Sequence, residues 1–243
     1  MNPSVKQARR LVRRGLDVVT SPVGSVLRFR GIGSAIALTF DDGPDPDVTP
    51  ALLDVLADAG ASATFFMLET RVRRYPEIAR SVRDAGHEIA LHGLDHRRLT
   101  DLSPADAAAS IARGKVELES TLDVPIRWFR PPYGAHDLRI WRTARALGMD
   151  VMLWGPSLHD WAEETREQRW SKINARPGDI VLGHDGIAGA IDGAGDDALP
   201  PNLDRAQWAG EVLEHYRSQG LTSITVSEAA RRGKAVRGAR WTR

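Results

Sequence analysis

Apolar and polar positions along the chain repeat in the pattern of an α/β protein. Short apolar runs predict strands, and the longer stretches between them have the apolar spacing of helices. The predicted strands cover 35–40, 63–68, 87–91, 126–129, 150–154, 179–182 and 221–226. The predicted helices lie near 49–59, 75–85, 103–122, 137–147, 163–175 and 204–218. About seven strand–helix units favour a parallel sheet that closes or nearly closes into a barrel, and an open doubly wound sheet is the alternative.

The two ends of the chain differ from this repeating body. We divide the chain into residues 1–30, with a basic helix and a short strand at 25–29, a single main domain over 31–230, and a basic tail over 231–243. A short helix from Ser227 precedes the tail. The glycine-rich stretch 185–203 is long for a connection, which predicts a loop over a functional site.

The N-terminal residues have an amphipathic pattern. Apolar residues within 5–19 fall on one helical stripe, and the basic residues lie mostly on the opposite face. This pattern favours a surface helix packed on the domain, and the alternative is a helix that contacts an anionic membrane surface. Lys and Arg residues interrupt any signal-peptide core, and no apolar run is long enough to cross a membrane. We therefore expect a cytoplasmic protein, with the inner face of the membrane as the alternative location.

Composition and charge narrow the chemistry. The chain of 243 residues has no cysteine, which excludes disulfides and thiolate–zinc sites, so any metal must have nitrogen and oxygen ligands. Residues 1–30 carry seven Lys or Arg against one Asp, and 231–243 carry six with no acid. The body between them has 20 basic and 31 acidic residues. An acidic body disfavours a nucleic-acid partner.

Polar residues that could carry chemistry collect at the carboxyl ends of the predicted strands. They are Asp41 and Asp42 after the first strand, His92 and His96 after the third, 130–134 after the fourth, 157–161 after the fifth, and His184 after the sixth. Parallel α/β barrels build their active sites at this face. Each piece alone has a simpler interpretation, because adjacent aspartates often form turns and an H-x-x-x-H pair often lies on a surface. Their common location favours a metal-dependent hydrolase.

The two aspartates should do different work, because neighbouring strand residues point to opposite sides. One of them can bind a metal ion together with His92 and His96, which leaves positions for water and substrate. The other can face the reacting centre as a base. A glycosidase is disfavoured, since its two carboxylates must flank one bond from separate supports.

Three further residues have roles that follow from the same arrangement. His184 fits the general acid, because the pKa of a histidine lies nearest neutrality. Asp160 could hold His184 in its charged form. Arg130 could keep the base ionised and oriented.

Five segments together resemble the polysaccharide deacetylases, the NodB-homology domain of carbohydrate esterase family four. Residues 39–44 match the motif T-F-D-D-G-P at every position, 92–96 match the histidines of H-[ST]-x-x-H, 130–134 resemble the third motif, 160–161 match the core of D-x-x-D-W, and 182–184 match L-x-H. The resemblance runs from about residue 35 to 226. It implies a single α/β domain, a distorted (β/α)7 barrel of the NodB-homology type.

The resemblance also implies a role for each matching residue. It makes Asp41 the general base, Asp42 the metal ligand beside His92 and His96, Arg130 the residue that orients the base, and His184 the general acid. Substrate-binding residues are expected at Pro132, Tyr133, Trp161 and Leu182, with the Tyr133 backbone N–H at the oxyanion. The expected cofactor is a divalent metal, Zn²⁺ first, with Co²⁺, Ni²⁺, Mn²⁺ and Fe²⁺ as alternatives.

The expected reaction is removal of an N-acetyl, O-acetyl or formyl group from an amino sugar, glycan or glycan precursor. A hydrolase of small or cyclic amides is the alternative on the same scaffold. A catalytically silent sugar-binding domain is disfavoured, because the base and the acid are both present. Gly93 stands where the family has Ser or Thr, and Ser157 replaces the first aspartate of the fourth motif. These departures favour a non-standard substrate, and the sugar and the oligomeric state stay open.

Overall fold

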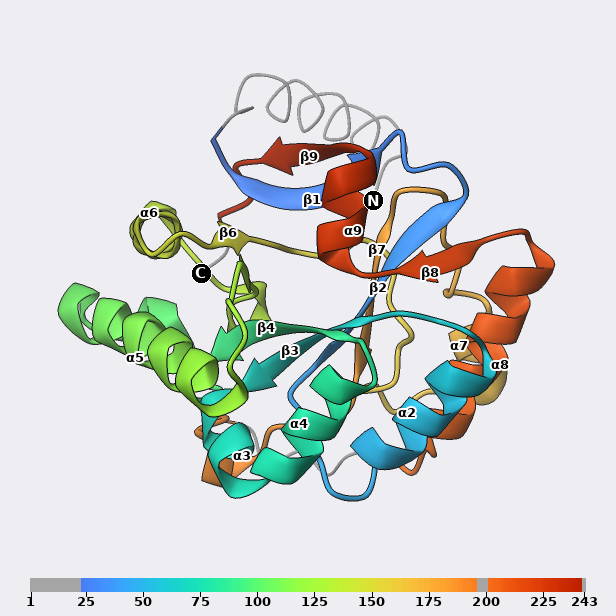
Figure 1. Cartoon of the computed structure of the whole chain (residues 1–243), viewed down its shortest axis with the longest axis horizontal. Helices are drawn as coiled ribbons and strands as arrows, with labels where there is room; N and C mark the ends of the chain where they lie inside the picture. The colour runs from blue at the N-terminus through green and yellow to red at the C-terminus, as the bar shows by residue number, and fades with distance from the viewer. Residues whose placement is uncertain (1–22, 196–200, 242–243) are drawn as a thin grey trace.

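A parallel sheet lies at the centre of the computed structural model, which describes residues 23–195 and 201–241 (Figure 1). Its strand order is β6-β5-β4-β3-β2-β7, and β8 pairs with the first residues of β2. The strands are β2 (Ala35–Asp41), β3 (Thr64–Leu68), β4 (Glu88–Gly93), β5 (Trp128–Phe129), β6 (Asp150–Val151), β7 (Ile180–His184) and β8 (Thr222–Ile224). Each strand overlaps a predicted one: β2, β4 and β7 extend one or two residues beyond the predicted ends, and β5, β6 and β8 are shorter than predicted.

The sheet curls, and irregular backbone closes the gap between its edge strands β6 and β7. Residues 155–158 follow β6 and pair with β7. The Gly155 N–H donates to the Ile180 carbonyl oxygen (3.0 Å), and the Leu158 N–H donates to the Leu182 carbonyl oxygen (2.7 Å). The Leu182 N–H in turn donates to the Pro156 carbonyl oxygen (3.1 Å). The predicted distorted barrel is therefore confirmed.

Helices cover the outside of the sheet. They are α2 (Thr49–Asp58), α3 (Glu69–Arg74), α4 (Pro76–Asp84), α5 (Pro104–Leu122), α6 (Leu138–Ala146), α7 (Arg166–Trp170), α8 (Arg205–Ser218) and α9 (Val226–Arg232). The start of α5 shows why these sequences form helices where they do: the Ser103 side chain accepts a hydrogen bond from the Asp106 N–H, and Pro104 occupies the first turn. Sequence periodicity does not predict α3, and α7 is shorter than its predicted range.

The core lies on both faces of β2, which is buried along its whole length. Ile36, Leu38 and Phe40 belong to a large cluster between the sheet and the helices, which also contains residues of α2 and α8. Ala35 and Ala37 point to the other side and belong to a smaller cluster with Phe29, Phe66 and Trp128. The alternation of strand side chains explains this division. Burial on both sides is typical of a parallel sheet and accounts for the continuous apolar run.

A second, two-stranded sheet lies beside the barrel (Figure 1). The predicted strand at 25–29 appears as β1 (Ser25–Arg30), which pairs antiparallel with β9 (Lys234–Gly238). Residues 234–238 belong to the stretch that sequence analysis assigns to a basic tail, and no sequence pattern predicts this strand. β1 also reaches the barrel, because the Phe29 N–H donates to the Gly178 carbonyl oxygen (2.7 Å).

The predicted N-terminal helix over 5–19 lies outside the described residues. Among the helices that are described, none combines the length and the apolar character that crossing a membrane requires.

Candidate active site

A pocket of about 370 Å³ opens at the carboxyl ends of the strands. Its lining includes Asp41, Asp42, His92, His96, Tyr133, Trp161, Leu182 and His184. The structure thus brings eight of the sequence-predicted site residues to one cavity. Arg130 and Asp160 are buried directly behind it. Pro132 does not line the pocket, and it packs instead behind Gly93, where its Cγ lies 3.5 Å from the position of an added Cβ.

Asp42, His92 and His96 form the first group in this pocket. The Oδ1 atom of Asp42 lies 3.3 Å from Nε2 of His92 and 3.3 Å from Nε2 of His96. Asp42 follows β2 with a φ of 76°, a left-handed conformation that turns its carboxylate away from the strand direction. Burial alone would raise the pKa of Asp42, but its close contacts with the His92 and His96 rings hold the pKa well below its usual range.

This group fits a divalent metal ion. The three ligand atoms lie within 4.8 Å of one another. Asp42 Oδ1 is buried and has no hydrogen-bond partner among the described residues. His92 Nδ1 donates to the Arg130 carbonyl oxygen (2.8 Å), so its proton lies on the far side of the ring and Nε2 is free to bind a metal. One oxygen and two nitrogens are a donor set that zinc and several other divalent metals accept.

Asp41 belongs to a second, separate group. Arg130 Nη1 donates to Asp41 Oδ1 (2.6 Å) and to Thr39 Oγ1 (2.9 Å). The guanidinium is fully buried and stacks over the Phe66 ring, 4.2 Å from its centroid. The other oxygen of Asp41 lies 3.9 Å from His92 Nδ1, at the edge of the metal group. A buried arginine therefore holds the Asp41 side chain in place.

His184 and Asp160 form the third group, across the pocket. Asp160 accepts hydrogen bonds from His184 Nδ1 (2.7 Å) and from the His184 backbone N–H (2.7 Å). Burial alone would lower the pKa of His184, but the charge and hydrogen bond of Asp160 outweigh it and raise the pKa to about 9. Trp161 lies edge-on to the His184 ring, with the centroids 5.3 Å apart. His184 is therefore cationic at neutral pH.

Tyr133 lies at the rim beside the metal group. Its φ is 59°, which turns the backbone sharply after Pro132. Its ring is 39% exposed and contacts His96 edge-on, with the centroids 4.4 Å apart. The Arg98 guanidinium lies 4.4 Å from the centroid of the same ring. Together with Trp161, Tyr133 gives the pocket an aromatic rim.

Comparison with known proteins agrees with this geometry. The family model described as polysaccharide deacetylase matches residues 31–152. The chain belongs to the polysaccharide deacetylase family. It is 36% identical over 203 residues to a peptidoglycan-N-acetylglucosamine deacetylase of Bacillus cereus, and the alignment covers 81% of this chain and 88% of the relative. It is also 36% identical over 169 residues to a chitooligosaccharide deacetylase of Azorhizobium caulinodans, with 68% and 80% covered.

A solved structure of the same family has the same fold. The peptidoglycan deacetylase PdaC from Bacillus subtilis superposes with a TM-score of 0.68 at 30% identity, and the superposition covers 82% of this chain and 91% of that one. The family that the sequence motifs resemble is thereby confirmed.

Sequence analysis missed a set of buried polar residues around the deacetylase site. Asp185, next to His184, accepts hydrogen bonds from the Gly43 N–H (3.1 Å) and from Thr49 Oγ1 (2.8 Å). Burial raises the pKa of Asp185 to about 7, and the nearby charge of Asp42 adds to the effect. Arg71 and Asp192 are also buried and bonded to each other. No local sequence pattern marks these residues, because their partners are distant in the chain.

The two departures from the family motifs have local explanations. A Cβ at Gly93 would lie 2.6 Å from the Asp95 carbonyl oxygen, so the backbone of this metal loop leaves no room for a side chain. Ser157 is buried, and its Oγ accepts a hydrogen bond from the His159 N–H (3.3 Å).

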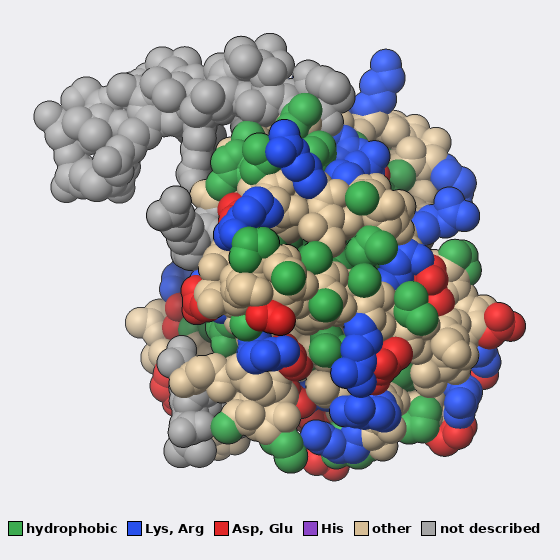
Figure 2. All heavy atoms as spheres, turned by 90° about the vertical axis from the view of Figure 1, so that its left-hand side faces the viewer, with side chains coloured by type: hydrophobic (Ala, Val, Ile, Leu, Met, Phe, Trp, Pro, Cys, Tyr) green, Lys and Arg blue, Asp and Glu red, His purple; other side chains and the backbone are tan. Residues whose placement is uncertain are grey.

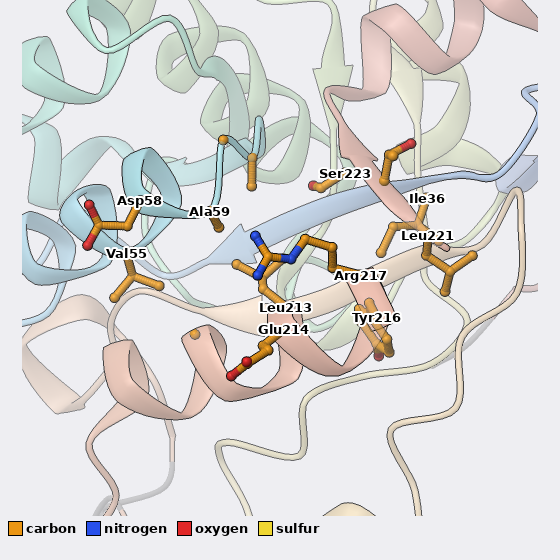
Figure 3. Close-up of a pocket in the computed structure, with 14 residues that line it drawn as sticks. Ile36, Val55, Asp58, Ala59, Leu213, Glu214, Tyr216, Arg217, Leu221 and Ser223 are labelled. Atoms are coloured by element: carbon orange, nitrogen blue, oxygen red, sulfur yellow. The ribbon is translucent and has the colours of Figure 1, made fainter. Parts of the chain in front are cut away.

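A second pocket, of about 440 Å³, lies between α2 and α8 (Figure 3). Much of its wall is apolar, formed by Ile36, Val55, Leu213 and Leu221. The Arg217 side chain lies between the two helices. Its lining contains no histidine and no cluster of potential metal ligands. The larger of the two cavities is therefore not the one with catalytic chemistry.

Proposed function

We propose that the protein is a metal-dependent deacetylase that hydrolyses the N-acetyl group of an amino sugar in a glycan. The observation that carries this proposal is the meeting of the three groups in one pocket: a site for a metal, a carboxylate held by a buried arginine, and a histidine with its own carboxylate. Amide hydrolysis requires these three parts, namely an electrophilic centre, a base and an acid.

A divalent metal bound by Asp42, His92 and His96 would polarise the acetyl carbonyl and lower the pKa of a water molecule. Asp41, held by Arg130, accepts the proton of the attacking water. The Tyr133 backbone N–H donates to the oxyanion that forms when water adds to the carbonyl carbon. His184 then protonates the departing nitrogen, so the C–N bond breaks and acetate and a free amine leave. We assign Zn²⁺ as the metal, with Co²⁺, Ni²⁺, Mn²⁺ and Fe²⁺ as alternatives.

The substrate class follows from the relatives and from the pocket. Two relatives are named for N-acetylglucosamine in peptidoglycan and for chitooligosaccharides. Tyr133 and Trp161 are 39% and 42% exposed at the rim, where flat sugar faces could stack on them. We therefore propose an N-acetylglucosamine-containing glycan as the substrate, with Trp161 and Leu182 on its binding surface.

Acetate release tests the proposal. The protein loaded with zinc should release acetate from chitooligosaccharides or from peptidoglycan, and a chelator should stop the release. Monomeric N-acetylglucosamine and a small cyclic amide serve as comparison substrates. Metal binding without acetate release from any acetylated sugar would contradict the proposal and would favour a sugar-binding module. Release from the cyclic amide alone would favour the small-amide hydrolase.

The proposal includes a contact between the N-terminal residues 5–19 and an anionic membrane surface. Exposed cations on and beside the small sheet of β1 and β9 support it, among them Arg30, Arg231 and Lys234, because β1 is the first described strand. Glu228 is the one acid of 225–241. Figure 2 shows several Lys and Arg side chains in the upper part of one face, with few Asp or Glu among them. Deletion of residues 1–20 should reduce binding to anionic liposomes, and unchanged binding would contradict this contact.

A further inference from the structure

Arg71 is a buried arginine that the catalytic groups do not use. It lies on α3 and is 7% exposed. Its Nε and Nη2 both donate to Asp192 Oδ2, at 3.1 and 2.8 Å, and Nη2 also donates to the Ile187 carbonyl oxygen (2.6 Å). Nη1 lies 3.4 Å from Asp45 Oδ2. One guanidinium thus binds two separate points of the loop that follows His184.

The same two points of this loop contact two of the three potential metal ligands. Next to Ile187, the Ala188 N–H donates to Asp42 Oδ2 (3.3 Å). At the other point, the Asp192 carbonyl oxygen accepts a hydrogen bond from the His96 N–H (2.7 Å). Each of the two loop points that Arg71 holds is therefore the same residue as, or the neighbour of, a residue whose backbone bonds to a potential ligand.

These contacts affect how Asp42 and His96 present their ligand atoms. Asp42 has two carboxylate oxygens, and the Ala188 N–H occupies Oδ2 while Oδ1 faces the histidines. The bond from His96 to Asp192 fixes the backbone from which the His96 ring projects. Partners of this kind orient metal ligands and raise metal affinity without binding the ion themselves.

A glycine in the loop leaves room for the Arg71 guanidinium. A Cβ at Gly186 would lie 2.4 Å from Arg71 Nη1, so glycine allows the guanidinium to approach the loop. Asp192 is 1% exposed, and an ionised carboxylate at such a depth requires a cation. Arg74, on the same helix, reaches only to 3.9 Å from its other oxygen. Arg71 is therefore the closer of the two cations that pair with Asp192.

We propose that Arg71 and Asp192 form a clasp that positions residues 185–194 against Asp42 and His96, and that this clasp sets the affinity of the metal site. Both are positioning residues, and neither touches the metal or the substrate. The inference rests on the metal site of the proposed function.

Metal affinity tests the clasp directly. The dissociation constant for Zn²⁺ is measured by competition with a chromogenic chelator for the full chain and for Arg71→Ala, Asp192→Asn and the double variant. We expect each single variant to weaken zinc binding by roughly 10- to 100-fold, the usual effect of losing a residue that orients a metal ligand. The double variant should be little worse than either single one, because both remove the same contact.

Two comparisons separate positioning from general damage to the fold. Arg73→Ala is the matched control on the same helix: Arg73 is exposed, lies 3.9 Å from Glu69, and should leave zinc affinity unchanged. Arg71→Lys keeps the charge but not the fork, so it should preserve the thermal midpoint of the metal-free protein better than Arg71→Ala while zinc binding stays weak. The visible spectrum of bound Co²⁺ should change in both Arg71 variants if Asp42 and His96 move.

The outcomes distinguish the clasp from the proposed function. Wild-type zinc affinity in both Arg71→Lys and Asp192→Asn would overturn the clasp and leave the deacetylase proposal intact. The absence of zinc binding by the unaltered chain would refute the metal site itself, and the clasp with it. If Arg71→Ala does not fold, the Arg71→Lys and Asp192→Asn measurements decide the question.

Discussion

The two sides of the active-site pocket differ in how the charge of a buried side chain is balanced. On one side, His184 has its counter-ion within the protein, because Asp160 accepts two hydrogen bonds from it at 2.7 Å. On the other side, Asp42 Oδ1 lies 3.3 Å from two imidazole nitrogens and has no hydrogen-bond partner among the described residues. The charge of His184 is therefore balanced within the protein, whereas the charge of Asp42 is balanced only when a cation binds. Substitutions on the two sides should therefore affect different steps.

The largest effect should come from loss of a metal ligand. His96→Ala removes one of three ligands, so the variant should lose bound zinc, and its activity should fall by more than the roughly 10²–10⁴-fold expected for loss of a proton-transfer group. Metal content by elemental analysis and acetate release measure the two effects. His215→Ala on α8 is the control, and it should retain both. Full metal content in His96→Ala would contradict the role of His96 as a metal ligand. The proposed difference between the two sides of the pocket would then be wrong.

Asp41→Asn should have the next largest effect, and it should separate binding from catalysis. The base is lost, so the rate should fall roughly 10²–10⁴-fold. Zinc content should stay the same, because Asp41 is not one of the proposed ligands. One of its oxygens bonds to Arg130, and the other lies 3.9 Å from His92 Nδ1. If Asp41→Asn released the metal while Asp42→Asn kept it, the roles of the two aspartates would be exchanged.

Asp160→Asn tests the acid side through its pH dependence. His184 must be protonated to act as an acid, so activity should be present below its pKa of about 9 and should fall as the pH rises through that value. Without the Asp160 charge, burial should lower the pKa of His184, and the alkaline limb of kcat/KM should move to lower pH. An unchanged alkaline limb would mean that another group controls it.

Much of this fold could be predicted because it depends on local patterns of apolar and polar residues. The strands of a parallel sheet are buried on both faces, so β2 and β7 appear as continuous apolar runs. Polar residues at the ends of such runs must converge, because parallel strands end at one edge. This reasoning predicts that Asp41, His92 and His184 lie close together, and all three line one pocket.

The parts that were not predicted depend on contacts between distant residues. β9 has the sequence Lys-Ala-Val-Arg-Gly, which is too polar to indicate a strand, and it forms because it pairs with β1 more than 200 residues away. Arg71 and Asp192 are ordinary charged residues in sequence, and only the fold makes them a buried pair. Local pattern therefore predicts the residues at the strand ends, including Arg130 and Asp160, better than Arg71 and Asp192, which bond to each other across more than 100 residues.

The smallest effect should come from Thr39, and it tests whether the two sides are separable. Thr39 Oγ1 donates to the Val181 carbonyl oxygen (2.7 Å) and accepts a hydrogen bond from Arg130 (2.9 Å). Thr39→Val removes both bonds from a buried position, which should lower the free energy of unfolding by about 1–3 kcal/mol. Because Asp41 still holds Arg130, the rate should fall less than about tenfold. Urea unfolding, kcat and zinc content measure the three quantities. The Arg130 carbonyl oxygen accepts a hydrogen bond from His92, so Arg130 connects the base to a metal ligand. Loss of zinc from Thr39→Val would show that a change at the base alters the metal ligands through Arg130. The two sides would then differ in their chemistry but would be coupled in structure.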